Sequence, residues 1–181
     1  MVEFVLLCLP TVGYLAVQSR RPGQTLHAAL GRAGLGWGTA SGYGWAALLL
    51  LPLLLIGWLS LVAIPPDLLA APGVVVGRPA SLAAAAGVVL RAAGEEVFFR
   101  GLLGGVLVRR LGFGWGNLLQ SVLFFLPHLA LLAVDVRLWP ILPVQFVTGW
   151  LLGWLRQRTA TMLPGAVLHA VANLTAGLIG S

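Results

Sequence analysis

Charged side chains are scarce in this sequence of 181 residues, because Asp, Glu, Lys and Arg together make up only 9% of it. A soluble globular domain carries about 25% charged residues. Hydrophobic residues account for 59%, so there is too little polar surface to coat a water-soluble particle of this size. These proportions exclude a disordered chain and a soluble domain, and they indicate a helical protein that crosses the lipid bilayer several times.

Lysine is absent, and cysteine occurs once, as Cys8. A single cysteine excludes an intrachain disulfide and a metal site built from several thiolates. The 11 basic residues are all arginine and give a formal net charge of +6. Because they are scattered between apolar runs and do not cluster on one face, we expect no nucleic-acid partner. The arginine-only composition, rich in Ala and Gly, favours a bacterial origin and a multi-pass protein of the inner membrane.

Long apolar runs make up most of the sequence, and a transmembrane helix needs about 20 such residues. We expect an all-α bundle of about six transmembrane helices with an intramembrane polar site. It forms a single membrane domain (1–181), with a variable N-terminal part (1–80) and a core (81–181). Pro65 and Pro66 should end the second span, and the polar stretch 19–41 allows a short interfacial helix. The expected spans are 2–17, 43–64, 81–108, 115–134, 138–155 and 163–179.

Four charged residues interrupt the third apolar run: Arg91, Glu95, Glu96 and Arg100. One charge at the centre of a bilayer costs about 2.5–3.5 kcal/mol on insertion scales, so such residues usually serve a function. In an α-helix Glu96 and Arg100 lie one turn apart on the same face, and we expect them to form an ion pair. Glu95 is rotated by about 100° from Glu96 and should remain unpaired and available.

Three further polar side chains lie in other apolar runs. His128 follows Pro127 in the fourth run, where the proline should disturb the helix. His169 and Asn173 are four residues apart in the sixth run and therefore share a helix face. The helical rise places Glu95 and His128 at roughly 20 Å from the same end of their helices, so the two can meet at one level. These residues predict a polar site inside the bundle.

Such a site suits hydrolysis by activated water. Burial disfavours the charged form of a carboxylate, which makes Glu95 a candidate general base, with His128 sharing the proton or positioning the water. His169 and Asn173 can donate hydrogen bonds to a developing oxyanion, at about 3–4 kcal/mol per donor. This scheme uses no covalent nucleophile, no metal ion and no cofactor.

Four short patterns on separate apolar runs resemble the motifs of the CPBP family: Glu95-Glu96-x-x-x-Arg100, Phe124-x-x-x-His128, Phe146-x-x-Gly149-x-x-x-Gly153 and His169-x-x-x-Asn173. That family comprises CAAX-type prenyl-protein endopeptidases and bacteriocin-processing (Abi) membrane proteins, described as glutamic intramembrane proteases. The resemblance covers about residues 94–173, the catalytic core, and implies a membrane-associated protein or peptide substrate cleaved near its C-terminus. The positions it marks are the water-activating Glu95 and His128, the oxyanion-site His169 and Asn173, and the supporting Glu96 and Arg100.

Other functions remain open at this point. Glu95, His128 and His169 make a two-His-one-carboxylate set that a zinc protease would use, although no His-Glu-x-x-His motif is present. A non-catalytic membrane scaffold or immunity protein of the same family is a second alternative. A transporter would also carry charges at mid-bilayer, but the sequence has no internal repeat. Gly149 and Gly153 are expected to form a close-packed helix face.

The arginines are unevenly divided between the two sides of a six-span bundle. One side carries Arg20, Arg21, Arg32, Arg109, Arg110, Arg156 and Arg158, and the other carries Arg78 and Arg137. The positive-inside rule assigns the richer side to the cytoplasm and both termini to the outside. Reporter fusions after Arg110 and Arg158 should therefore report the cytoplasm, and fusions after Pro66 and Ser181 the outside. The reverse pattern would contradict this orientation.

Overall fold

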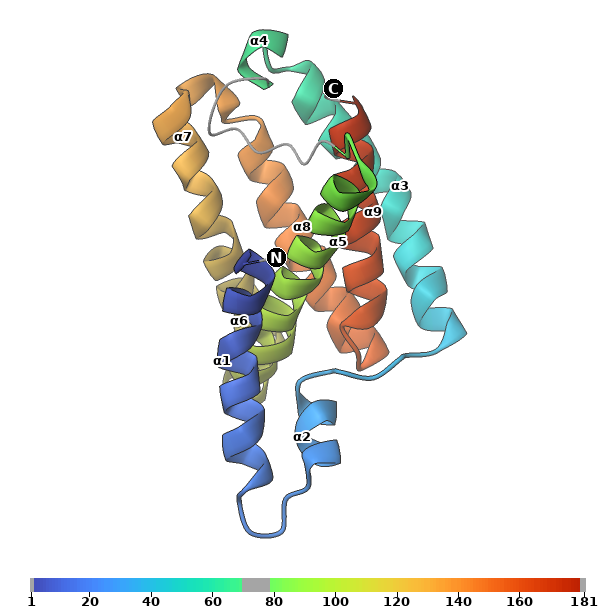
Figure 1. The fold of residues 1–181 in the computed structure, drawn as a ribbon, viewed down its shortest axis with the longest axis vertical. Helices are drawn as coiled ribbons and strands as arrows, with labels where there is room; N and C mark the ends of the chain where they lie inside the picture. Colours follow the sequence, from blue (N-terminus) through green and yellow to red (C-terminus); the bar gives the residue numbers. More distant parts are fainter. Residues whose placement is uncertain (1, 70–78, 180–181) are drawn as a thin grey trace.

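Helices make up nearly all of the computed structural model, which describes residues 2–69 and 79–179 and contains no strand within them (Figure 1). The α-helices are α1 (Val2–Ser19), α2 (Leu26–Arg32), α3 (Ala40–Val62), α4 (Pro66–Leu69), α5 (Leu82–Glu96), α6 (Gly105–Phe125), α7 (Leu131–Val134), α8 (Ile141–Thr159) and α9 (Leu163–Ile179). A π-helical segment, η1 (Val97–Gly104), joins α5 to α6, and two 3₁₀ segments, η2 (Leu126–Ala130) and η3 (Val136–Leu138), flank α7. The predicted all-α fold is confirmed.

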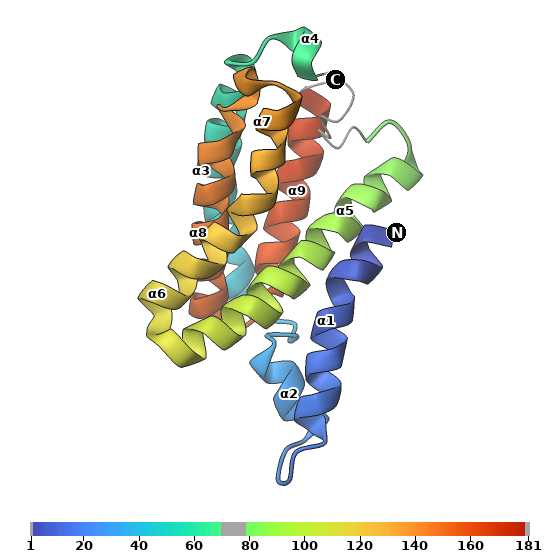
Figure 2. The ribbon, with the colours of Figure 1, turned by 90° about the vertical axis from the view of Figure 1, so that its left-hand side faces the viewer.

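Four helical stretches among the described residues are long and apolar enough to cross a membrane: Val2–Ser19, Ala40–Val62, Leu82–Val134 and Val136–Thr159. The third is 53 residues long and turns back on itself, so it supplies two legs of the bundle (Figure 2). The shorter apolar helix α9 has 17 residues. The chain is therefore a multi-pass membrane protein whose helical legs follow the apolar runs of the sequence.

The reversal of the long stretch occurs at Gly112, whose φ of +75° and ψ of 169° lie outside the helical region. Glycine suits this position because an L side chain rarely adopts a positive φ. Gly116 then lets the two legs approach closely: a Cβ added to it would lie 2.6 Å from the backbone N and Cα of Val108. The break predicted between residues 108 and 115 is confirmed.

Other boundaries agree with the expectation in part. α3 ends at Val62, before Pro65 and Pro66, as predicted. The fourth span changes from α to 3₁₀ geometry after Phe125, because Pro127 lacks the N–H that an α-helix needs there. The π-helical segment η1 was not predicted, since α-helical periodicity alone gives no sign of it. Residues 70–78, which include the Arg78 of the orientation prediction, lie outside the described residues.

α9 occupies the middle of the bundle, packed against α3 and against α5, while α8 packs against α6 and α3 (Figure 1). The apolar contact among α3, α8 and α9 is made by Ala46, Leu53, Leu152, Leu155 and Leu168. The predicted close-packed glycine face is confirmed, because a Cβ on Gly153 would meet Asn117 and Gln120 of α6. This packing places α5, α6, α8 and α9 around the polar residues.

Gly116→Ala should destabilise the protein, because the added Cβ would clash with backbone atoms of Val108. Overpacking of this kind costs about 1–3 kcal/mol, and a chain of this size loses about 2–4 °C of melting temperature per kcal/mol. Thermal unfolding of the detergent-purified protein measures the shift. Gly114→Ala is the matched control, since no atom lies within 4 Å of its added Cβ. Equal melting temperatures for the two variants would contradict the close approach.

Candidate active site

Glu96 and Arg100 form a fully buried ion pair where α5 passes into η1. Arg100 Nη1 lies 2.8 Å from Glu96 Oε1, and neither side chain is exposed. Arg100 Nη2 also donates to the carbonyl oxygen of Gly149 in α8, at 3.4 Å, and the guanidinium lies 4.1 Å above the ring centroid of Phe124 in α6. The predicted ion pair is confirmed, and it links η1 to both α6 and α8.

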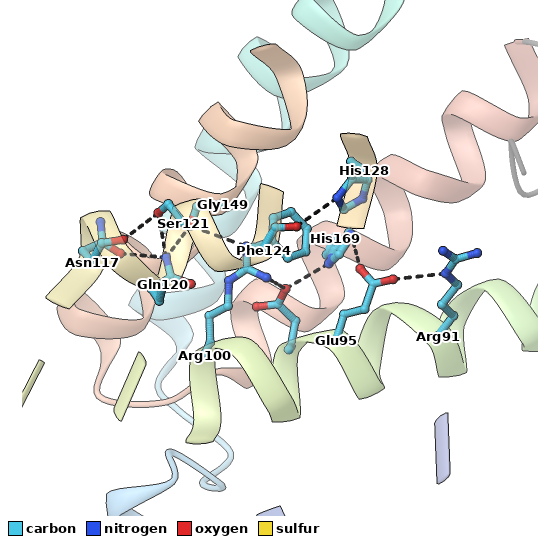
Figure 3. Close-up of polar contacts among 11 residues, drawn as sticks. Arg91, Glu95, Arg100, Asn117, Gln120, Ser121, Phe124, His128, Gly149 and His169 are labelled. Atoms are coloured by element: carbon cyan, nitrogen blue, oxygen red, sulfur yellow. Dashed lines mark hydrogen bonds and ion pairs between the residues drawn. The ribbon is translucent and has the colours of Figure 1, made fainter. Parts of the chain in front are cut away.

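His169 connects this ion pair to the second glutamate (Figure 3). Its Nδ1 lies 2.9 Å from Glu96 Oε1, and its Nε2 lies 3.7 Å from Glu95 Oε2. Because an ionised carboxylate only accepts hydrogen bonds, Nδ1 is the nitrogen that donates to Glu96. The ring also packs edge-on against Phe124, with centroids 5.9 Å apart. Contacts on both nitrogens therefore hold the orientation of His169 and turn Nε2 toward Glu95.

Glu95 is not unpaired, contrary to the sequence-based expectation. Arg91 Nε lies 3.1 Å from Glu95 Oε1, and the same nitrogen lies 3.6 Å from Glu3 Oε2 in α1. The prediction was wrong because the four-residue spacing that pairs Glu96 with an arginine also pairs Glu95 with Arg91. The Glu95 side chain is nevertheless 12% exposed, whereas that of Glu96 is fully buried. Of the two glutamates, Glu95 is therefore the one whose side chain can reach an open space.

That open space is a cavity of about 770 Å³. The four residues predicted to be catalytic, Glu95, His128, His169 and Asn173, all line it, and the Glu96–Arg100 pair lies behind them in the packed interior. Most of the remaining wall is apolar and includes Leu53, Leu54, Trp58, Leu61, Val88, Leu131, Val134, Ile141 and Val144. The fold therefore gathers the polar residues of three separate runs on one side of a largely apolar cavity.

His128 lies in η2, directly after Pro127. Its Nδ1 is 2.9 Å from the carbonyl oxygen of Phe124. Since a carbonyl oxygen only accepts, Nδ1 carries the proton of the neutral ring and Nε2 carries the lone pair. The ring rests on that of Phe124, with centroids 5.0 Å apart. The 3₁₀ turn thus presents a half-buried histidine with one nitrogen free to accept a proton.

A buried polar cluster in α6, made of Asn117, Gln120 and Ser121, supports the site from behind. Gln120 Nε2 donates to the carbonyl oxygen of Gly149 at 2.8 Å and to Asn117 Oδ1 at 2.9 Å, and Ser121 Oγ donates to the Asn117 carbonyl at 2.7 Å (Figure 3). Because the Gly149 carbonyl also accepts from Arg100, this cluster fixes the position of an acceptor that Arg100 uses.

A family model described as type II CAAX prenyl endopeptidase Rce1-like matches residues 78–175, which is more than half of the chain. The chain belongs to this family. No curated protein and no solved structure matches it. Membership assigns the chain to the membrane proteases and gives it an intramembrane endopeptidase activity in general terms. The matched residues include Glu95, Glu96, Arg100, His128, His169 and Asn173.

Four polar residues that line the cavity of this Rce1-like endopeptidase were not assigned to it from the sequence: Glu3, Ser60, Gln145 and Thr148. Arg91 was noted from the sequence as a charge inside an apolar run, but its pairing with Glu95 was missed. The signal for Arg91 was its four-residue spacing from Glu95. The signal for Gln145 and Thr148 was their three-residue spacing, which puts both on one face of α8.

The zinc-protease alternative needs a set of donor side chains around one ion, and the part of the chain that the structure describes has no such set. No group of three or more His, Cys, Asp or Glu side chains there is disposed to hold a metal ion. The set considered from the sequence was Glu95, His128 and His169. In the structure Glu95 is paired with Arg91, and His128 Nδ1 is engaged by a backbone carbonyl.

Glu96→Gln should destabilise this endopeptidase more than Glu95→Gln does. Removing one partner of a buried ion pair leaves the other charge buried alone, which costs about 3–5 kcal/mol. Arg91, the partner of Glu95, is 41% exposed and can be solvated, whereas Arg100 cannot. Thermal unfolding in detergent measures the difference, with Asp135→Asn in the exposed Arg137 pair as the control that changes little. Equal losses for the two glutamate variants would contradict the described burial.

Proposed function

We propose that this Rce1-like endopeptidase hydrolyses a peptide bond of a membrane-associated protein or peptide near its C-terminus, using a water molecule activated by Glu95 and His128. The observation that carries the proposal is the convergence of Glu95, His128, His169 and Asn173 on one cavity of about 770 Å³. General acid–base chemistry needs its groups within reach of one substrate atom, and a shared cavity is the arrangement that permits this.

Glu95 and His128 both act on the attacking water molecule. The Glu95 carboxylate takes one proton of the water, and the water oxygen attacks the scissile carbonyl carbon. His128 accepts the second O–H at Nε2, the nitrogen left with its lone pair because Nδ1 donates to the Phe124 carbonyl. A positioned general base contributes about 10²–10⁴-fold to the rate.

His169 and Asn173 then stabilise the tetrahedral oxyanion. Asn173 supplies an amide N–H from the same face of α9, four residues after His169. His169 Nε2 lies 3.7 Å from Glu95 Oε2, so the proton taken from the water can pass to Nε2 and make it a donor. Collapse of the intermediate breaks the C–N bond, and the same proton leaves with the new amine. Glu96 and Arg100 support these steps by holding Nδ1 of His169.

The apolar wall of the cavity supports a substrate with a hydrophobic or lipid-bearing C-terminal end. Leu53, Leu54 and Trp58 of α3 lie among the lining residues that face the space next to the polar group. Cavities of about 300–1,000 Å³ with such walls enclose apolar ligands well. The composition favours a bacterial inner-membrane protein, for which a maturation or protein-sorting substrate fits better than a prenylated one.

The orientation proposed from the arginine bias also fits the contacts at one end of the bundle. Arg109 and Arg156 both donate to the carbonyl oxygen of Arg32, so three arginines from α2, α6 and α8 gather there. The positive-inside rule makes this the cytoplasmic end and leaves both termini outside.

Three peptides test the function in vesicles that contain the purified protein. The first carries a prenylated CAAX end, the second has the same sequence without the prenyl group, and the third ends in an apolar segment. Mass spectrometry of the products should show cleavage of the membrane-bound peptides, with protein-free vesicles as the control. Cleavage of the unprenylated, soluble peptide alone would contradict the substrate class. Failure to cleave any of the three would favour a non-catalytic scaffold or immunity protein.

Loss of an oxyanion donor should appear in kcat with little change in KM, because the donor acts on the transition state. Asn173→Ala should lower kcat by about 10²–10³-fold, the range for one removed donor. The double variant His169→Ala with Asn173→Ala should lose less than the product of the single losses, because both groups serve one oxygen.

The same variants separate this mechanism from a zinc protease. A zinc site predicts that His169→Ala releases a bound metal while Asn173→Ala stays nearly fully active. Kinetics measured beside the metal content of each purified variant distinguish the two mechanisms, and that second pattern would overturn ours.

A further inference from the structure

A second cavity, of about 290 Å³, lies away from the active site and shares no lining residue with it. It is lined by residues of α1, of the segment that joins α1 to α2, of α2 itself and of the first turns of α6. We name it the arginine pocket. Its lining residues are Tyr14, Gln18, Arg21, Gln24, Arg32, Val106, Arg109 and Arg110.

The charge of the arginine pocket is not neutralised within the part of the chain that the structure describes. Four arginines line the pocket and no carboxylate does. The ion pairs of the described residues join arginines and acids elsewhere, at Arg91, Arg100 and Arg137. Near the active site, by contrast, Arg91 and Arg100 each have a glutamate. The pocket therefore concentrates positive charge without a protein counter-ion.

Arg32 carries hydrogen-bond donors that no protein atom satisfies. Its Nη1 donates to Gln24 Oε1, but its Nε and Nη2 are buried and have no hydrogen-bond partner. Buried N–H groups of native proteins are nearly always paired. Two donors without a partner on one guanidinium therefore indicate a missing acceptor. Nε and one Nη of an arginine are the two donors that bind an oxyanion through two parallel hydrogen bonds.

The neighbouring groups are held in place by neutral acceptors. Arg109 Nη1 donates to the Arg32 carbonyl oxygen at 3.0 Å, and Arg109 Nη2 donates to Tyr14 Oη at 2.9 Å. Tyr14 uses its oxygen as the acceptor in that contact, so its own O–H is left to donate. These contacts orient Arg109 without cancelling its charge. The pocket thus presents preorganised guanidinium groups and a hydroxyl donor around an open space.

We propose that the arginine pocket binds a phosphate group, carried either by the headgroup of an anionic phospholipid or by a free phosphate compound. Guanidinium groups match the geometry of phosphate oxygens and are weakly hydrated, which favours this anion. Basic pockets between transmembrane helices at the cytoplasmic end are where anionic headgroups lie. The phosphate supplies the acceptors that Arg32 Nε and Nη2 lack.

Melting temperatures of the 181-residue chain in detergent test the proposal, because a ligand that binds the folded state raises the melting temperature by an amount that grows with the ratio of ligand concentration to Kd. The probes are short-chain phosphatidylglycerol, short-chain phosphatidylcholine and inorganic phosphate. Phosphatidylglycerol should stabilise the wild type more than phosphatidylcholine does. A comparable effect of inorganic phosphate assigns the site to free phosphate compounds, and an effect of the anionic lipid alone assigns it to a headgroup. No stabilisation by any probe would overturn the proposal.

The double variant Arg32→Gln with Arg109→Gln should raise the Kd of the best probe by at least about tenfold, since two charge-assisted partners are lost. Arg20→Gln with Arg158→Gln is the matched control: it removes one arginine just after α1 and one in the last turn of α8, and neither lines the pocket. The control should change the Kd by no more than about threefold. Equal changes in both double variants would mean general charge attraction and would overturn the proposal.

A second double variant tests the same pocket in case the first double variant does not fold. The side chains of Arg21 and Arg110 make no hydrogen bond or ion pair with other described residues, so Arg21→Gln with Arg110→Gln should leave the ligand-free melting temperature unchanged. This variant should also weaken binding beyond the control. An unchanged Kd here, together with an unchanged Kd in the first variant, contradicts a phosphate site in this pocket.

Discussion

The buried ion pair between Glu96 and Arg100 is the contact on which the rest of the structure depends. Two charges without water are tolerated only when their geometry is good and their remaining hydrogen-bonding groups find partners. Those partners come from other helices: His169 of α9 donates to Glu96, and the Gly149 carbonyl of α8 accepts from Arg100. These two contacts form only when the helices are packed, whereas Glu96 Oε2 and Arg100 Nε have no hydrogen-bond partner among the described residues. The same packing turns His169 Nε2 toward Glu95 and so fixes the geometry of the proposed site.

Irregular backbone lies beside the cavity on two of its helical stretches. The π-helical segment η1 begins immediately after Glu96, and the 3₁₀ segment η2 contains Pro127 and His128. Single π-helical turns are rare and occur often at functional sites. At η2 the missing N–H of Pro127 ends α6, and the Phe124 carbonyl oxygen accepts from His128 Nδ1. Each irregular segment adjoins one polar side chain of the site, because Glu96 directly precedes η1 and His128 lies in η2.

The apolar runs predicted the helical segments and the break between residues 108 and 115, and four-residue spacing predicted the Glu96–Arg100 pair, because each depends on residues that are close in sequence. The same rule applies to Arg91 and Glu95, and the pairing was missed only because Glu96 was given the sole arginine partner. The contacts of His169 with Glu96 and Glu95 join residues more than 70 positions apart and depend on how α9 packs against α5. Spacing within one helix carries no information about such contacts. The π-helical η1 likewise has no signature in the order of apolar residues.

The most direct test of this account is the rate of peptide cleavage by Glu95→Gln, compared with wild type at equal amounts of folded protein. Glutamine keeps the size of the side chain and removes the base. The proposed role of Glu95 predicts a loss of at least about 10²-fold, the lower end of what a positioned general base contributes. The thermal unfolding curve of the same preparation shows that the variant is folded. Turnover within about threefold of wild type would contradict the assignment of Glu95 as the base and with it the proposed mechanism.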